Sequence, residues 1–320
     1  MALPDWVISF FHSPPALLLV ALLLEAFIPI PSRWKPSALR PLLDRLVKRV
    51  HHAYSSTSQQ WITGVLLPSV VVVPSLIGSW SFRNLAPSDA LFDVVLLMWL
   101  LESHSVKERL HAIQQLLKQK KIALARLQLG AGVLRDTQSL SEMGLCKAAI
   151  EMSLLRLVKQ WLTVGFVYLL LGIHGALFYR LIQLIAQACN LKLPANRICG
   201  ELSARLTQAF NLVPVYSIVL LQTLLPRGIL AWKTAFRQFR LWPDLISGLV
   251  LIHTSTSLNL GLGGPRFYSG TKVRYPRIGG ITDPSPDRLL SAYYRIQFIG
   301  WFIWLAVFLT QGWFFYAKLA

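Results

Sequence analysis

Charged residues are scarce in this chain of 320 residues. They make up 14% of it, against about 25% in ordinary soluble domains, while apolar residues make up 54%. The shortage falls mainly on acids, since 14 Asp and Glu stand against 32 Lys and Arg. This composition excludes an ordinary soluble domain and is typical of a polytopic membrane protein.

Cysteine and the common catalytic motifs are also scarce. The three cysteines are odd in number and have no C-x-x-C spacing, which predicts free thiols. The sequence has no phosphate-binding P-loop, dinucleotide motif or H-E-x-x-H motif, and no nucleophile–histidine set can be assigned. His104, Glu108 and His111 share one helical face, but no fourth ligand accompanies them, so a solvated face is favoured and no metal site is assigned.

Long apolar runs recur along the chain. The clearest are Pro15–Ile30, Trp61–Trp80, Trp161–Leu177 and Phe298–Tyr316, and the weaker ones are Ala90–Leu101, Leu212–Leu225 and Leu245–Leu262. Runs of this length cross a bilayer as helices. The sequence therefore predicts an all-α polytopic membrane protein with about five to seven membrane segments, built as a single membrane-embedded domain over 1–320.

The positive charge lies between the apolar runs. A net charge of +18 could indicate nucleic-acid binding, but ten Lys or Arg fall in 102–160, six in 31–60 and one in 81–88. This distribution follows the positive-inside rule. It predicts that 31–60 and 102–160 are cytoplasmic, and that the partner of the positive charge is the lipid bilayer and no nucleic acid.

The largest polar segment, 102–160, reads as a cytoplasmic helical insertion. Apolar residues recur at helical spacing over 104–129, and a break at Gly130–Gly132 follows. Ser139 and Glu142 have the spacing of a capping box, which predicts a second helix over about 140–158.

The run that begins at Leu245 turns polar from His253 to Asn259. Hydroxyl groups at membrane depth must face protein or a wet cavity. A full crossing would also place the six cations of 263–297 outside. A re-entrant or half-buried segment is therefore favoured.

Residues 258–280 form a glycine-rich loop. Six glycines lie within it and Gly248 lies upstream, while four cations, Arg266, Lys272, Arg274 and Arg277, meet no acid before Asp283. Glycine lets backbone N–H groups approach a ligand and form anion-binding nests. The loop therefore reads as an anion-binding site for phosphate or carboxylate, and equally well as a tight positive-inside loop.

Three further polar positions are candidates. Glu25 lies inside the first apolar run, where a pairing or functional role is favoured over a snorkelling residue. Arg180 is either a buried partner for such a carboxylate or an interfacial cation, and the second is favoured. The element Arg135-Asp136-Thr137 follows a glycine turn and could bind phosphate, although a local turn with a helix cap is favoured.

The order of residues in the glycine-rich loop resembles a known signature. It reads Leu262-Gly263-Gly264-Pro265-x-x-Tyr268-x-Gly270-x-Lys272-Val273-x-x-Pro276-x-Ile278-Gly279. This is similar to the C-terminal signature of the adenosylcobinamide-phosphate synthase family (CobD/CbiB) of cobalamin biosynthesis. Further matches are Arg135-Asp136-Thr137 ahead of Glu151, Ser203-Ala204-Arg205, and Asn211-x-x-Pro214.

The resemblance implies a multi-pass protein of the bacterial inner membrane that joins adenosylcobyric acid to aminopropanol, or to its phosphate, through an amide bond. It implies a corrinoid or other anionic small molecule as ligand, and ATP with Mg²⁺ if the synthase activity is present. The implied catalytic candidates are Glu25, Asp136 and Glu151. The implied phosphate-binding residues are Arg135, Thr137, Gly263, Gly264, Pro265, Arg266, Tyr268 and Lys272.

The chain departs from the family pattern mainly at acids. Thr207-Gln208 stands where the family has two acids, and of an E-x-x-A-E-N-x-x-D-G run only Glu151 is kept. These losses favour a second interpretation, a non-catalytic relative that keeps the scaffold and senses or binds a ligand; the AmpE-type membrane regulators resemble such diverged cousins of the family. A transporter is a third interpretation, but no related half of the chain supports it.

Overall fold

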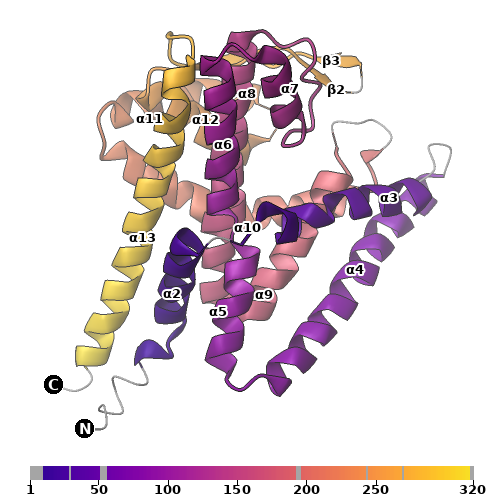
Figure 1. Ribbon diagram of the computed structural model, residues 1–320, viewed down its shortest axis with the longest axis vertical. Coiled ribbons are helices and arrows are strands. Elements are labelled where there is room, and N and C mark those ends of the chain that lie inside the picture. The colour runs from indigo at the N-terminus through magenta and orange to yellow at the C-terminus, as the bar shows by residue number, and fades with distance from the viewer. Residues whose placement is uncertain are drawn as a thin grey trace. The chain divides into compact units, whose positions relative to one another are not determined.

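The chain is helical throughout most of its length (Figure 1). The computed structural model describes residues 10–28, 30–50, 56–191, 196–242, 244–268 and 270–317. The α-helices are α2 (Pro14–Phe27), α3 (Arg40–Val50), α4 (Thr57–Leu85), α5 (Asp89–Leu100), α6 (Ser103–Lys118), α7 (Ile122–Gly130), α8 (Glu142–Leu157), α9 (Thr163–Ala188), α10 (Glu201–Thr223), α11 (Gly228–Gln238), α12 (Leu245–Ser257) and α13 (Leu289–Ala317).

Each predicted apolar run contains an α-helix over most of its described length, which confirms the all-α membrane class. Four helical stretches are long and apolar enough to cross a membrane: Thr57–Leu85, Glu142–Ala188, Glu201–Thr223 and Pro286–Ala317. Shorter apolar helices are α2 and α12. The chain divides into two compact units, which we describe separately: unit 1 (1–102, 160–210 and 302–320) and unit 2 (103–159 and 211–301).

Unit 1 is built around α9, which packs against α2, α3, α4 and α5. Close packing needs Gly165, because a Cβ there would overlap the ring of Trp304. At Gly172 the backbone has φ 69°, which interrupts the helical path in the middle of α9. All three cysteines are free and buried, as predicted for their thiols, and the Sγ atoms of Cys189 and Cys199 lie 3.8 Å apart.

Unit 2 contains the predicted helical insertion. The apolar stripe of α6 is fully buried, and α6 packs against α7 and α8 (Figure 1). The prediction of one helix over 104–129 is wrong, because the chain turns between α6 and α7, where Lys120 has φ 58°. The capping box at Ser139 is also wrong, since Ser141 caps α8 by accepting a hydrogen bond from the Gly144 N–H.

Helix α12 supports the interpretation of a segment that does not fully cross. Its 13 residues extend about 20 Å, less than the hydrocarbon thickness of about 30 Å. As predicted, its polar half faces protein, since His253 through Ser257 are all buried. The Gln222 amide on α10 bonds the His253 ring (2.8 Å) and the Thr254 hydroxyl (3.0 Å).

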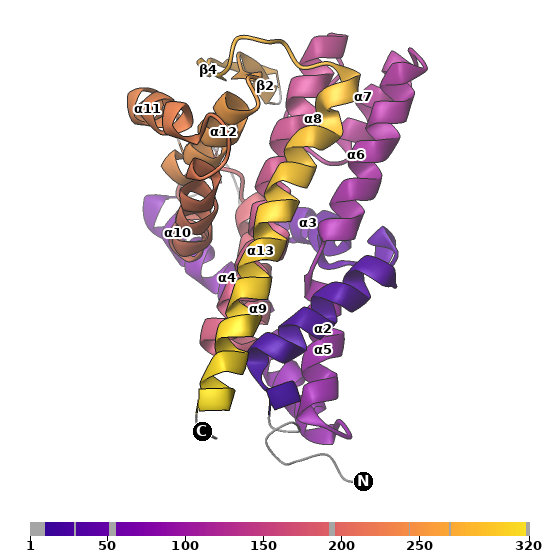
Figure 2. The same ribbon diagram turned by 90° about the vertical axis from the view of Figure 1, so that its left-hand side faces the viewer.

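The glycine-rich loop folds into two antiparallel ribbons. Strand β1 (Gly261–Gly263) pairs with β4 (Arg277–Gly279), and β2 (Arg266–Tyr268) pairs with β3 (Thr271–Val273). The β1–β4 ribbon packs against α12, and its strand β4 also contacts α11 (Figure 2). Glycine is required at Gly263 and Gly279, where φ is positive and a Cβ would collide with the Pro276 carbonyl and the Ser255 hydroxyl, respectively.

Candidate functional site

The carboxylate of Glu151 joins two of the predicted elements in unit 2. Its Oε2 lies 2.9 Å from Arg135 Nη2 and 2.9 Å from Arg266 Nη2. Its Oε1 accepts a hydrogen bond of 2.8 Å from the Gly263 N–H. The Arg135 element and the glycine-rich loop therefore meet at one acid. We call Glu151, Arg135 and Arg266 the arginine cluster.

Two aromatic rings cover the guanidinium of Arg266. Its Cζ lies 4.2 Å from the ring centre of Tyr275 and 4.8 Å from that of Trp242. The residue is only 7% exposed, and its Nε has no hydrogen-bond partner among the described residues. An unsatisfied buried donor is costly, so this nitrogen would gain from an acceptor that reached it.

Asp136 fixes the β2–β3 ribbon to the loop before α8. Its N–H donates to the Phe267 carbonyl (2.8 Å), and its Oδ2 accepts from the Gly270 N–H (3.0 Å). The neighbouring Thr137 is buried, and its hydroxyl donates to the Arg126 carbonyl (3.0 Å). Asp136 therefore bonds the distant glycine-rich loop, Thr137 bonds α7 nearby, and Arg135 reaches the arginine cluster.

The remaining predicted phosphate-binding residues surround the cluster with backbone and exposed charge. Gly264 has φ 100°, and its N–H donates to the Pro276 carbonyl (3.2 Å). Tyr268 is buried and Pro265 is exposed. Lys272 is also exposed, with its Nζ 5.9 Å from the ring centre of Phe267. The glycine-rich loop therefore combines exposed cations, Lys272, Arg274 and Arg277, with the buried guanidinium of Arg266.

The cluster keeps an excess of positive charge at neutral pH. Burial lowers the pKa of Arg135, and the Glu151 carboxylate offsets this shift in part. Burial also lowers the pKa of Arg266, but Glu151 outweighs it and the net shift is upward. A guanidinium is so basic that it stays protonated at neutral pH in either case. Two positive groups therefore face one carboxylate.

The acids of unit 2 fit a divalent cation only together with a bound phosphate. Among the described residues, no three His, Cys, Asp or Glu side chains are grouped as metal ligands. Mg²⁺ commonly takes one or two carboxylates together with phosphate and water oxygens. Asp136 is the acid available for this role, since no cation contacts it in the described chain, whereas Glu151 is held by two arginines.

Glu25 belongs to a different cluster, in unit 1. It is 1% exposed and lies 4.0 Å from Lys35 Nζ, which supports the pairing role. Lys35 Nζ also donates to the carbonyls of Met98 (2.7 Å) and Leu101 (2.6 Å) at the end of α5.

Arg180 belongs to the same unit 1 cluster. The prediction of an interfacial cation is wrong, because Arg180 is fully buried and its Nη2 lies 2.5 Å from Glu102 Oε1. Glu102 also accepts a hydrogen bond from the Ser37 N–H (2.8 Å). We call Glu25, Lys35, Glu102 and Arg180 the balanced cluster, because it has two acids and two cations.

Several residues around the arginine cluster were not predicted from the sequence. Trp242 and Tyr275 cover Arg266, and the side chain of Gln238 accepts a hydrogen bond from the Gly279 N–H (3.2 Å). Tyr275 lies inside the glycine-rich loop, next to its signature proline, so an aromatic residue beside the cations was the one available signal. Trp242 and Gln238 carried no such signal.

Comparison with known proteins gives one family. The family model described as CobD/Cbib protein matches residues 18–295. A protein of Chromobacterium violaceum named "Cobalamin biosynthesis protein CobD" is 26% identical over 297 residues, covering 92% of this chain and 95% of the relative. No solved structure gave a significant match.

Two further relatives carry similar names. The "Cobalamin biosynthesis protein CobD" of Stutzerimonas stutzeri is 28% identical over 298 residues, covering 92% of this chain and 96% of the relative. The "Probable cobalamin biosynthesis protein CobD" of Methanothermobacter thermautotrophicus is 25% identical over 263 residues, covering 80% and 86%. The matches thus extend over nearly the whole of each chain.

Proposed function

Because this chain belongs to the CobD/CbiB family of cobalamin biosynthesis proteins, we propose that it is a multi-pass synthase of the bacterial inner membrane. In this proposal it joins adenosylcobyric acid to aminopropanol, or to aminopropanol phosphate, through an amide bond. The relatives from Chromobacterium violaceum and Stutzerimonas stutzeri each match over 92% of this chain, and their printed names assign them to cobalamin biosynthesis.

The observation that carries the proposal is the arginine cluster. Its two guanidiniums share one carboxylate, and the Nε of Arg266 has no hydrogen-bond partner among the described residues. A phosphate oxygen would satisfy this donor and offset the excess positive charge. Lys272 is exposed at the same loop and would add a further cation to the phosphate.

The reaction forms a bond between a carboxylate carbon and an amine nitrogen, with loss of a carboxylate oxygen. ATP with Mg²⁺ would supply the activation that this loss of oxygen requires. In this proposal Asp136 would hold the divalent cation together with phosphate and water ligands, and Arg266 and Lys272 would orient the phosphate. Glu151 positions both guanidiniums and does not react itself.

A second candidate is a non-catalytic relative that binds the same class of ligand. Two cations stand where the family run has Asn and Asp, and both have structural partners here. Arg156 Nη2 donates to the Gly132 carbonyl (2.7 Å), and Lys159 pairs with Asp244 (3.6 Å). These partners would keep the scaffold intact without the family's acids.

One experiment separates the two candidates. The purified chain in lipid nanodiscs is incubated with adenosylcobyric acid, aminopropanol phosphate and MgATP, and products are identified by mass spectrometry. The synthase gives a product whose mass is the sum of the two substrates minus one water. If the chain forms no product but inorganic phosphate raises its unfolding temperature, the non-catalytic relative is supported. Neither product nor stabilisation contradicts both candidates.

A further inference from the structure

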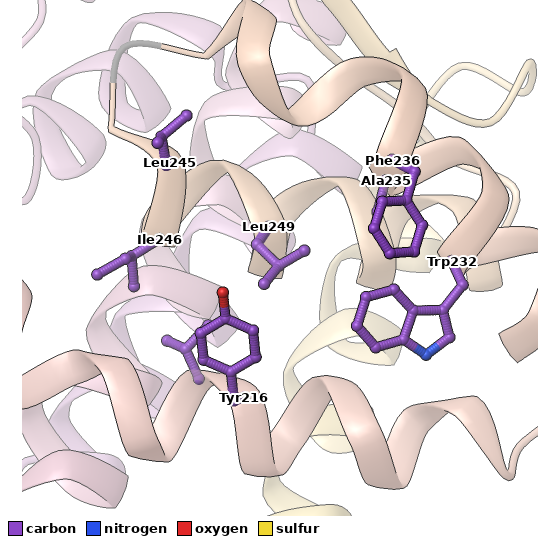
Figure 3. A pocket seen from close by; sticks show the side chains of 8 residues that line it. Tyr216, Trp232, Ala235, Phe236, Leu245, Ile246 and Leu249 are labelled. Carbon is purple, nitrogen blue, oxygen red and sulfur yellow. The ribbon is translucent and has the colours of Figure 1, made fainter.

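Unit 2 has an apolar groove that the proposed reaction does not use. It encloses about 250 Å³ between α10, α11 and α12. Figure 3 shows its lining of apolar and aromatic side chains, among them Tyr216, Trp232, Phe236, Leu245, Ile246 and Leu249. Pockets for drug-sized ligands usually hold about 300–1,000 Å³, so this groove is too small for a corrin ring. No charged side chain lines it, which favours a hydrocarbon occupant.

The groove is continuous with an exposed apolar face of α10. Val213, Tyr216 and Leu220 recur at helical spacing along this helix, and each is more than half exposed. Helix α10 is also one of the stretches long enough to cross a membrane. Tyr216 belongs both to the exposed stripe and to the groove lining. The groove therefore opens where α10 would meet lipid.

Helix α11 borders the groove with positive charge. It buries its small residues, Gly228, Ala231 and Ala235, while Phe236 is 69% exposed. Lys233 and Arg237 are exposed and four residues apart, so they form one stripe next to the Trp232 and Phe236 side. Short helices with an apolar side and a basic side lie in the membrane interface and attract anionic lipids.

No acid in this part of the chain neutralises that stripe. The sequence contains no Asp or Glu between Glu201 and Asp244. Asp244 itself pairs with Lys159 (3.6 Å) and accepts a hydrogen bond from Ser247. The positive charge of α11, at the edge of the apolar groove, would therefore attract an anion from outside the chain.

We propose that this groove holds one acyl chain of an anionic phospholipid, whose phosphate pairs with Lys233 and Arg237. The hydrocarbon fills the space among Trp232, Phe236 and Leu249, and the headgroup stays at the level of α11. This lipid site is independent of the arginine cluster and of the proposed synthesis. It selects phosphatidylglycerol over the zwitterionic phosphatidylcholine.

The test measures retained lipid. The full chain is equilibrated in micelles with equal amounts of phosphatidylglycerol and phosphatidylcholine, separated from free lipid, and extracted for mass spectrometry. We expect the wild type to retain phosphatidylglycerol at least about tenfold over phosphatidylcholine, the effect of two cations near an anionic headgroup. The double variant K233Q/R237Q should lose this preference while still retaining lipid.

A second variant tests the groove itself. Leu249→Trp fills the space among the three helices and should reduce retention of both lipids at least about fivefold. If it fails to fold, the surface variant K233Q/R237Q still decides the question. Matched controls are K121Q/R288Q, which removes two exposed cations elsewhere in unit 2, and Leu220→Trp, which adds the same ring on α10 outside the groove.

Four outcomes would overturn the proposal. They are absence of retained phospholipid, equal retention of the two lipids by the wild type, unchanged preference in K233Q/R237Q, and displacement of the lipid by added cobinamide. The last result would assign the groove to the corrinoid. Loss of preference in the K121Q/R288Q control would mean that overall charge, and not α11, selects the lipid.

Discussion

Each unit buries an ionic cluster, and the two clusters differ in their balance of charge. In the balanced cluster of unit 1, Glu102 neutralises Arg180 and Glu25 lies near Lys35. In the arginine cluster of unit 2, Glu151 alone faces two guanidiniums. A balanced buried cluster is complete by itself, whereas excess charge gains from an added anion. The excess of positive charge, more than the burial of the charged groups, therefore distinguishes the candidate binding site.

The largest effect is expected from breaking the balanced cluster. Glu102→Gln keeps the shape of the side chain but leaves Arg180 buried without its carboxylate. We expect a loss of about 3–5 kcal/mol in the free energy of unfolding, which added phosphate does not restore. Thermal unfolding in nanodiscs measures it, with Glu108→Gln as control, because Glu108 is 59% exposed. Restoration by phosphate would show that the clusters do not differ as described.

Breaking the arginine cluster should give a smaller and partly reversible loss. Glu151→Gln leaves Arg135 and Arg266 facing each other without their shared carboxylate. We expect a loss of about 2–4 kcal/mol, of which inorganic phosphate at millimolar concentration restores a substantial part, because the anion replaces the missing charge. The same unfolding series, with and without phosphate, measures it. A loss that phosphate leaves unchanged would remove the contrast between the clusters.

The affinity for phosphate should depend more on the buried Arg266 than on the exposed Lys272 of the glycine-rich loop. Arg266→Ala should weaken phosphate binding about 10–100-fold, because a buried charge-assisted hydrogen bond is worth about 1.5–3 kcal/mol. Lys272→Ala should weaken it about two- to fivefold, as expected for an exposed pair. Isothermal titration with inorganic phosphate gives both values, and K121Q serves as control. Unchanged affinity in both variants would mean that the loop is only structural.

The smallest effect concerns Asp244, at the start of α12. Burial raises the pKa of this carboxyl, but Lys159 and Ser247 outweigh it, and the pKa lies below its ordinary value near 3.9. The stabilisation is therefore complete above about pH 5 and is lost as the pH falls through the lowered pKa. Asp244→Asn should cost about 1 kcal/mol at pH 6, and this cost should shrink as the pH is lowered from 6 through the lowered pKa. A difference in unfolding temperature that stays constant over this range would contradict the assignment.

Apolar periodicity predicted much of the fold from sequence. The apolar runs and the stripe of α6 recur at spacings that define a buried or lipid-facing side, so those helices could be foreseen. The turn at Lys120 could not be foreseen, because a lysine at positive φ gives no glycine or proline signal. The start of α8 at Ser141 was ambiguous, since two serines flank Leu140.

The candidate site was predictable in its motifs and not in its contacts. The order of residues around Gly263 and the element at Arg135 indicated that the two segments share a function, and Glu151 indeed contacts both. That Glu151 binds two arginines depends on side-chain directions across distant segments, which spacing does not give. The burial of Arg180 likewise depends on its contact with Glu102, which spacing along the chain does not show.

The position of Lys35 has a consequence for the order in which the protein is made. Its ammonium fills the carbonyl end of α5, a helix that the ribosome completes some sixty residues later. The partner is thus present before the carbonyls that need it emerge. We expect an amine-reactive reagent to modify Lys35 in nascent chains stalled before α5 and to spare it once α5 has emerged. Lys35 is therefore a C-terminal capping residue that is synthesised before the helix that it caps.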